Sequence, residues 1–248
     1  MLNLTAEIMA DDILVSVSQI SMFKACPRSW YWKYVMKTKE PYRPWLNTGI
    51  NFHLCIEHAY KKIKGEKILT EKTFDSDIVD MVNIGFKKKI LTIPNIFLLE
   101  HNIKFPVCEG AYLKGVADFI NVSDGKIEDH KTISSWQYAE TEETLKNNFQ
   151  LLVYAKWYLD KVKNRNSIVL KHNQFHKNAP DTSRSVEVKV SRKYVMDNWE
   201  TNALPYIKQM VALKKNTDEN AFEFNQDACG NYGGCSFTEI CHGFKGKK

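Results

Sequence analysis

The sequence predicts a mixed α/β (α+β) fold in which helices flank a central mixed sheet. Two observations carry this prediction. Stretches with apolar residues at helical spacing alternate with strand-like stretches, and the strand-like stretches all lie between residues 97 and 191. The chain has 248 residues, of which 44% are hydrophobic, so it is long enough to bury one large core. We therefore expect the helices to pack around one sheet.

Three helices are predicted before the first strand. The first begins at the candidate N-cap residue Ser18 and continues through an aromatic-rich stretch to about Val35. The second covers residues 48–65 and the third residues 76–90. The apolar stripe of the second helix consists of Phe52, Cys55, Ile56, Ala59 and Ile63.

The remaining elements alternate between strands and helices. One helix is predicted over residues 141–163 and a longer one from about Arg192 to Lys215. The Asp124-Gly125 pair is typical of a two-residue hairpin turn. The predicted strands are residues 97–107, 111–122, 126–133, 167–175 and 185–191.

Charge and hydropathy limit the class of protein. Lys and Arg exceed Asp and Glu to give a formal net charge of +6, a mild bias that suits a polyanionic partner without proving one. No apolar run reaches the roughly 18 residues of a membrane helix, and no secretory leader is evident. We expect a cytoplasmic protein without a membrane association.

The predicted hairpin brings three ionisable side chains together. In a two-residue turn at Asp124-Gly125, Asp118 lies opposite Lys131, and strand alternation puts Asp129 on the same face. Glu128 then points to the opposite face and is excluded from the group. Two carboxylates beside a lysine suit metal-assisted phosphodiester cleavage. On the hairpin alone, a cross-strand ion pair explains them equally well.

The order of motifs along the chain resembles the PD-(D/E)XK nuclease superfamily and, within it, the RecB-like branch. Gly49 to His53 reproduces a G-x-x-x-H motif, and Gln150 to Tyr154 a Q-x-x-x-Y motif on the following helix. The segments GVAD and DHKT between them resemble the paired G-x-x-D and D-Y-K-T motifs. Two departures are Ala117, where the family name has proline, and His130, where tyrosine is frequent.

The resemblance implies a restriction-endonuclease-like core and a set of functional residues. Lys131 would be the catalytic lysine, acting with Asp118 and Asp129, and the metal would be Mg²⁺ or Mn²⁺. Gln150 and Tyr154 would support the site, although a Tyr in the core with a Gln at its edge explains them without the motif. The implied metal ligands are His53, Asp118, Asp129 and the main-chain carbonyl of His130.

Four of the six cysteines are candidate ligands of a metal or cluster, and two are not. Cys229, Cys235 and Cys241 are separated by five residues each and are one short of a tetrathiolate site. Cys26 is the leading candidate for the fourth ligand, because its segment CPRSWY resembles the one that carries the first cluster cysteine in iron–sulfur RecB-like proteins. That resemblance implies a structural 4Fe–4S cluster, and a structural Zn²⁺ is the alternative. Cys55 and Cys108 are interpreted as small buried hydrophobes.

These features predict a DNA nuclease that depends on Mg²⁺ or Mn²⁺, an exonuclease acting on single-stranded DNA or duplex ends. The alternative is a DNA-end binding or processing subunit of a CRISPR adaptation or recombination complex. The arrangement of the cysteines resembles that of CRISPR-associated RecB-like adaptation nucleases and phage exonucleases, and this resemblance implies a prokaryotic or phage-encoded protein. The predicted organisation is one RecB-like nuclease domain over residues 1–248. It contains an N-terminal helical segment (18–45) that carries the first cluster cysteine, a catalytic sheet and helix (100–190), and a cysteine module (222–248) packed on the N-terminal helix.

Overall fold

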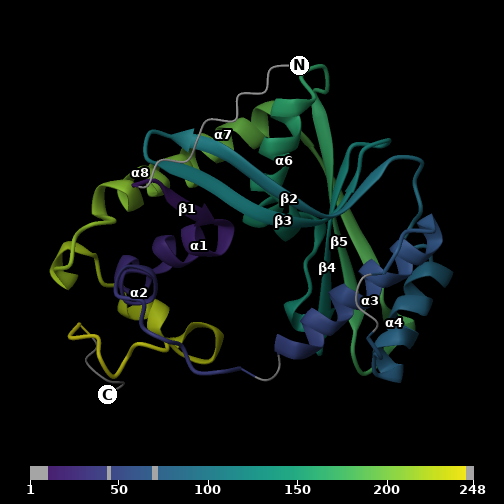
Figure 1. Ribbon diagram of the computed structural model, residues 1–248, viewed down its shortest axis with the longest axis horizontal. Coiled ribbons are helices and arrows are strands. Elements are labelled where there is room, and N and C mark those ends of the chain that lie inside the picture. The colour runs from purple at the N-terminus through teal and green to yellow at the C-terminus, as the bar shows by residue number, and fades with distance from the viewer. Residues whose placement is uncertain (1–10, 44–45, 69–71, 244–248) are drawn as a thin grey trace. The chain divides into compact units, whose positions relative to one another are not determined.

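The computed structural model describes residues 11–43, 46–68 and 72–243 (Figure 1). The predicted segments 18–45 and 222–248 each end in residues outside these ranges, 44–45 and 244–248. The chain divides into two compact units. Unit 1 takes its described residues from 1–42, 104–115 and 198–248, and unit 2 from 43–103 and 116–197. Within the described part, no helix is long and apolar enough to cross a membrane.

The strands form a six-stranded mixed sheet, and five of its strands are the predicted ones. The sixth, at residues 13–16 before the first helix, was not predicted, because four residues are too few to show a clear strand pattern. The strand order is β1-β3-β4-β5-β6, and β2 pairs with β3. β1 runs parallel to β3, β4 parallel to β5, and the β3–β4 and β5–β6 pairs are antiparallel. The bounds are β1 (Ile13–Ser16), β2 (Phe97–Cys108), β3 (Ala111–Asn121), β4 (Lys126–Ile133), β5 (Ser167–His176) and β6 (Arg184–Ser191).

Two long predicted helices are each interrupted at a proline. The first becomes α1 (Val17–Ala25), α2 (Pro27–Trp30) and a π-helical turn (Tyr31–Val35), and its N-cap is Ser16 instead of Ser18. Cys26 is extended at the break because a residue before proline disfavours the α region. The last predicted helix divides into α7 (Arg192–Asn202) and α8 (Leu204–Leu213).

Within unit 1, the N-terminal helices pack against the C-terminal segment. The Arg28 side chain donates to the Phe222 carbonyl and forms an ion pair with Glu219, and the Asn225 side chain donates to the Ala25 carbonyl. The Phe222 ring lies against Tyr31, with centroids 4.6 Å apart. The cysteine module is therefore packed on the N-terminal helical segment, as the sequence predicts.

Unit 2 contains the helices that cover the two faces of strands β4 and β5. α3 (Leu46–Lys64) and α4 (Ser76–Lys87) lie on one side of these strands, and α6 (Phe149–Lys161) lies on the other (Figure 1). A short helix, α5 (Glu142–Lys146), precedes α6, and Asn148 caps α6 by accepting a hydrogen bond from the Leu151 backbone N–H. The predicted single helix over 141–163 is thus two helices.

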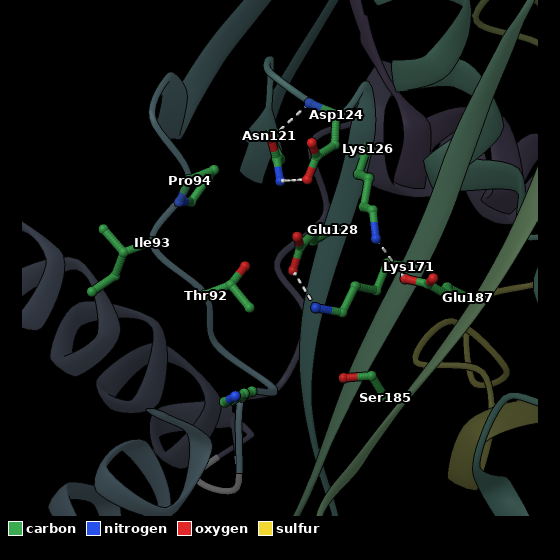
Figure 2. Close-up of a pocket in the computed structure, with 11 residues that line it drawn as sticks. Thr92, Ile93, Pro94, Asn121, Asp124, Lys126, Glu128, Lys171, Ser185 and Glu187 are labelled. Carbon is green, nitrogen blue, oxygen red and sulfur yellow. Dashed lines mark hydrogen bonds and ion pairs between the residues drawn. The ribbon is translucent and has the colours of Figure 1, made fainter. Parts of the chain in front are cut away.

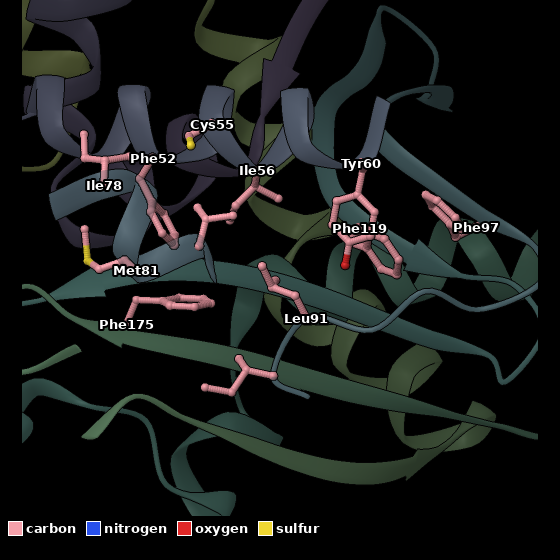
Figure 3. Packing of buried hydrophobic residues seen from close by; sticks show 12 residues of the cluster. Phe52, Cys55, Ile56, Tyr60, Ile78, Met81, Leu91, Phe97, Phe119 and Phe175 are labelled. Carbon is pink, nitrogen blue, oxygen red and sulfur yellow. The ribbon is translucent and has the colours of Figure 1, made fainter. Parts of the chain in front are cut away.

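The core of unit 2 lies between the sheet and the α3–α4 pair (Figure 3). The Phe52 ring on α3 packs against Phe175 of β5, with centroids 4.7 Å apart, and Tyr60 packs against Phe119 of β3 at 5.1 Å. Cys55 is buried in the same cluster, as predicted for a small hydrophobe. This packing fixes the position of α3 on the sheet.

The β3–β4 hairpin has a different register from the predicted one. Phe119 pairs with Glu128 and Asn121 with Lys126, so the turn contains four residues instead of two. The Asn121 side chain stabilises this turn by bonding both the backbone and the side chain of Asp124. One further step of this register places Asp118 beside Asp129. Because each partner moves by two residues, every side chain stays on its predicted face.

Candidate active site

Two buried carboxylates form the centre of the candidate site. Asp118 of β3 is 8% exposed and Asp129 of β4 is 3% exposed. The Asp118 Oδ2 atom accepts a hydrogen bond of 2.7 Å from the backbone N–H of His130. Adjacent antiparallel strands thus hold the two carboxylates on one face, as the alternation of side chains predicts.

Lys131 and Gln150 both bind one oxygen of Asp129. The Lys131 Nζ atom lies 2.8 Å from Asp129 Oδ1, and Gln150 Nε2 of α6 donates to the same oxygen at 3.0 Å. The Lys131 side chain is 45% exposed, so its amine reaches solvent while its partner is buried. The predicted catalytic lysine therefore lies where a bound substrate could contact it.

Tyr154 lies one helical turn beyond the half-buried Gln150 and is itself buried. Burial and then the charges of Asp118 and Asp129 raise the pKa of Tyr154 to about 12. Hydrogen bonds with the Val116 backbone and the Gln150 side chain oppose this shift. The Q-x-x-x-Y pair thus faces the two carboxylates.

His53 of α3 approaches the carboxylates together with a residue that the sequence did not predict. Its Nδ1 atom lies 3.7 Å from Asp118 Oδ2 and 3.5 Å from Oε1 of Glu100 on β2. Potential ligand atoms of His53, Glu100 and Asp118 all lie within 4.8 Å of one another. Glu100 has a positive φ of 44°, a strained conformation for a residue other than glycine.

The two carboxylates have opposite pKa shifts. Burial, and then repulsion from Asp129, raises the pKa of Asp118 to about 7, although His53 and Lys131 act against the rise. Burial also penalises the Asp129 anion, but Lys131 and His172 more than compensate and lower its pKa. Two carboxylates that lie close together repel each other, so the one with the stronger cationic partner is ionised more readily than the other.

His172 of β5 is a second neighbour of the site that sequence reasoning missed. In the parallel ladder it pairs with Asp129, and its Nε2 atom lies 3.2 Å from Asp129 Oδ2. This contact is not an aligned hydrogen bond, and Asp129 Oδ2 is buried without an aligned donor. The Nδ1 atom of His172 lies 3.2 Å from Gln174 Nε2.

The site has the donor set that a divalent cation of the Mg²⁺ type requires. Hard cations prefer carboxylate oxygens, and His53, Glu100 and Asp118 supply two carboxylates and one imidazole within reach of one ion. The buried Oδ2 of Asp129, 3.2 Å from His172 Nε2, is a further carboxylate oxygen beside this group. The residues present therefore fit a divalent metal.

Comparison with known sequences assigns the family. Residues 14–242 match the sequence profile of the PD-(D/E)XK nuclease superfamily. The chain belongs to this superfamily. The predicted superfamily and its mixed α/β core are thereby confirmed. No curated protein sequence matches the chain significantly.

Solved structures similar to this PD-(D/E)XK chain are distant in sequence. A crystal structure from Eubacterium rectale, of a protein provisionally named an exonuclease, matches with a TM-score of 0.56 and 12% identity over 86% of this chain and 85% of that one. The crystal structure of LHK-Exo in complex with dAMP matches with a TM-score of 0.37 and 12% identity over 84% and 93% of the two chains. The first likeness shows a shared fold.

Glu128 points to the opposite face of β4, as strand alternation predicts, and belongs to a separate polar cluster there (Figure 2). Lys171 Nζ lies 3.1 Å from Glu128 Oε2, and Asn173 donates to the same oxygen at 2.8 Å. Asn173 also bonds His130 Nδ1 at 3.1 Å. The His130 side chain is thus held away from the carboxylate face, and only its backbone faces Asp118.

The four predicted cluster cysteines lie in unit 1. Burial, followed by the nearby thiols of Cys235, Cys26 and Cys241, raises the pKa of Cys229. Cys26 itself is 6% exposed at the break between α1 and α2. Segments about 200 residues apart in sequence thus bring four thiols close enough to influence one another. Cys108 is only half-buried.

Proposed function

We propose that the chain is a Mg²⁺- or Mn²⁺-dependent deoxyribonuclease of the RecB-like branch, an exonuclease that hydrolyses single-stranded DNA or duplex ends. One observation carries the proposal. In a chain of the nuclease superfamily, Asp118, Asp129 and Lys131 lie on one face of the β3–β4 hairpin, with His53 beside them. The exonuclease activity and the branch come from the resemblance of the motifs.

In this proposal, a divalent ion would be held by His53, Asp118, Asp129 and the main-chain carbonyl of His130, and Glu100 would be a further ligand. When bound, such an ion polarises a phosphodiester and makes a coordinated water more acidic. Bonds to His130 N–H, Lys131 and Gln150 hold the two carboxylates in place before DNA arrives.

Lys131 would contribute a positive charge at the reacting phosphate. Its attraction to Asp129 and Asp118 more than offsets the effect of burial and raises the pKa of Lys131, so the amine stays protonated at neutral pH. A protonated amine can orient the attacking water and stabilise the negative charge that develops on the phosphate oxygens. Gln150 and Tyr154 would support this arrangement from α6.

We further propose that Cys26, Cys229, Cys235 and Cys241 bind a structural 4Fe–4S cluster. Two observations support this proposal. The CPRSWY segment resembles the one that carries the first cluster cysteine in iron–sulfur RecB-like proteins, and the four thiols lie close enough to influence one another's pKa. A structural Zn²⁺ held by the same thiolates is the alternative.

Cleavage of end-labelled DNA by the purified protein tests the proposed function. Single-stranded and duplex DNA, each labelled at the 5′ or the 3′ end, should be degraded with Mg²⁺ or Mn²⁺ and remain intact with EDTA. Circular DNA without ends should resist. Tight binding to DNA ends without cleavage would instead favour a DNA-end binding subunit of a CRISPR adaptation or recombination complex.

Glu100 provides a separate test of the metal site. The Glu100→Gln variant removes one carboxylate charge from the group around His53 and should weaken Mn²⁺ binding by about tenfold, as supporting ligands typically do. Titration calorimetry without DNA measures the affinity. Glu66→Gln, on an exposed carboxylate after α3, is the matched control and should bind Mn²⁺ like wild type. Equal affinity in all three proteins would remove Glu100 from the site.

A further inference from the structure

Gly49 is the one part of the G-x-x-x-H motif to which the proposed chemistry gives no role. It is the fourth residue of α3, and its φ is not in the left-handed region that favours glycine. A glycine inside a helix is less stable than alanine, because it loses more backbone freedom on folding. Its presence here therefore needs another reason.

Packing inside the protein does not supply that reason. A Cβ atom added at Gly49 would have no heavy atom within 4 Å. Gly85 in α4 shows the opposite case, because a Cβ there would lie 2.9 Å from the Phe175 ring and 3.0 Å from Leu91. Gly85 is a packing glycine, whereas Gly49 faces open space.

The open space at Gly49 belongs to a cavity of about 420 Å³ beside the metal-binding residues. His53 and Glu100 line it, so its contents would lie next to the proposed reaction centre. A cavity of this size is large enough for one nucleotide unit. Its lining consists of Gly49, Ile50, His53, Leu54, Glu57 and Glu100.

The residues that line the cavity indicate which part of a nucleotide it would hold. Ile50 and Leu54 offer apolar surface, and the carboxylate oxygens of Glu57 and Glu100 can accept hydrogen bonds. Among the described residues, the lining contains no lysine or arginine that would attract a phosphate, and Lys61, which pairs with Glu57 at 2.6 Å, is not part of it. Apolar surface and hydrogen-bond acceptors suit a nucleobase and its sugar.

We infer that this cavity, the Gly49 pocket, holds the base and sugar of the nucleotide adjacent to the scissile phosphate, and that Gly49 is glycine so that this nucleotide can approach α3. The inference rests on the proposed nuclease function. It assigns Gly49 a positioning role, because the residue shapes the pocket and contributes no reacting group.

Filling the pocket from Gly49 tests the inference. Gly49→Leu should raise the Kd for a fluorescein-labelled single-stranded oligonucleotide in EDTA by about tenfold or more, and slow cleavage with Mn²⁺ similarly. Its Mn²⁺ affinity without DNA should be that of wild type. The melting temperature should be unchanged or about 1–3 °C higher, since the side chain enters empty space in a helix.

Two controls separate bulk in the pocket from other effects. Gly49→Ala adds a single carbon atom and should change binding far less than Gly49→Leu. Asn47→Leu places the same side chain at an exposed position in the first turn of α3 and should bind DNA like wild type.

The outcomes distinguish this inference from the proposed function. Wild-type binding and cleavage by Gly49→Leu would overturn the pocket assignment and leave the nuclease intact. A wild-type protein that binds the oligonucleotide but never cleaves it would overturn the nuclease, and weaker binding by Gly49→Leu would still support a nucleotide site. A wild-type protein that neither binds nor cleaves DNA would overturn both.

Discussion

Replacing Lys131 by alanine is expected to reduce metal-dependent DNA cleavage by about 10²–10³-fold, the usual effect of removing one group that stabilises developing charge. Lys131 is the half-exposed cation on the carboxylate face of β4, and its amine lies 2.8 Å from Asp129 Oδ1. The variant should keep its Mn²⁺ affinity within a few fold, because the carboxylates and His53 remain. Single-turnover cleavage of end-labelled DNA measures the loss.

Lys126→Ala is the matched control for this variant. Lys126 lies on the same strand but on the opposite face, where it pairs with Glu187 at 3.0 Å. Its loss removes the same charge from the protein without touching the carboxylate face, so cleavage should stay near wild type. Equal cleavage by the Lys131→Ala and Lys126→Ala variants would contradict the catalytic role of Lys131.

Asp118→Asn should abolish cleavage while making the protein without metal more stable. The folded-state pKa of Asp118, about 7, lies above its unfolded value of 3.8, so folding disfavours the anion. The destabilisation begins as pH rises above the unfolded pKa and is fully present above pH 7. Asparagine keeps an oxygen that can accept the His130 N–H bond and lacks the charge. Its melting temperature at pH 8 in EDTA should therefore exceed that of wild type.

Cleavage and melting temperature, measured on the same variant, show whether the loss of activity is caused by unfolding. An inactive Asp118→Asn protein that melts higher than wild type has lost a functional group and kept its fold. A lower melting temperature at pH 8 would show that Asp118 stabilises the folded protein, and the assigned pKa shift would be wrong.

The face of each hairpin residue could be predicted from sequence although the turn length could not. Side chains along a strand alternate between the two faces, so only a shift by an odd number of residues changes the face. The predicted register was wrong by two residues, and Asp118, Asp129 and Lys131 therefore kept a common face. The four-residue turn depends on side-chain bonds between Asn121 and Asp124. Such bonds compete with the simple Asp-Gly turn and are not visible as a periodic pattern.

The two residues that sequence reasoning missed depend on contacts between distant segments. Glu100 reaches His53 from a strand position with positive φ, which a regular alternation does not predict. His172 reaches Asp129 because β5 runs parallel to β4, and the register of a parallel pair is set by the intervening crossover and core packing. A charged residue within a predicted strand was the only local signal for Glu100.

Replacing Cys26 by serine is expected to remove the visible absorption of an iron–sulfur cluster and to lower the stability of the protein by several kcal/mol. The binding free energy of a structural metal group is largely folding free energy, because the unfolded chain cannot hold its ligands together. Cys26 would connect the α1–α2 break with a segment that begins about 200 residues later. Iron and sulfide analysis of anaerobically purified protein, with thermal unfolding, measures both effects.

Cys108→Ser is the matched control, since Cys108 belongs to the same unit, is half-buried and is not one of the proposed ligands. This variant should keep full iron content and lose no more than about 1 kcal/mol, as expected for a partly exposed side chain. Equal iron content in the Cys26→Ser protein would remove Cys26 from the ligand set. Zinc in place of iron in the wild-type protein would overturn the cluster.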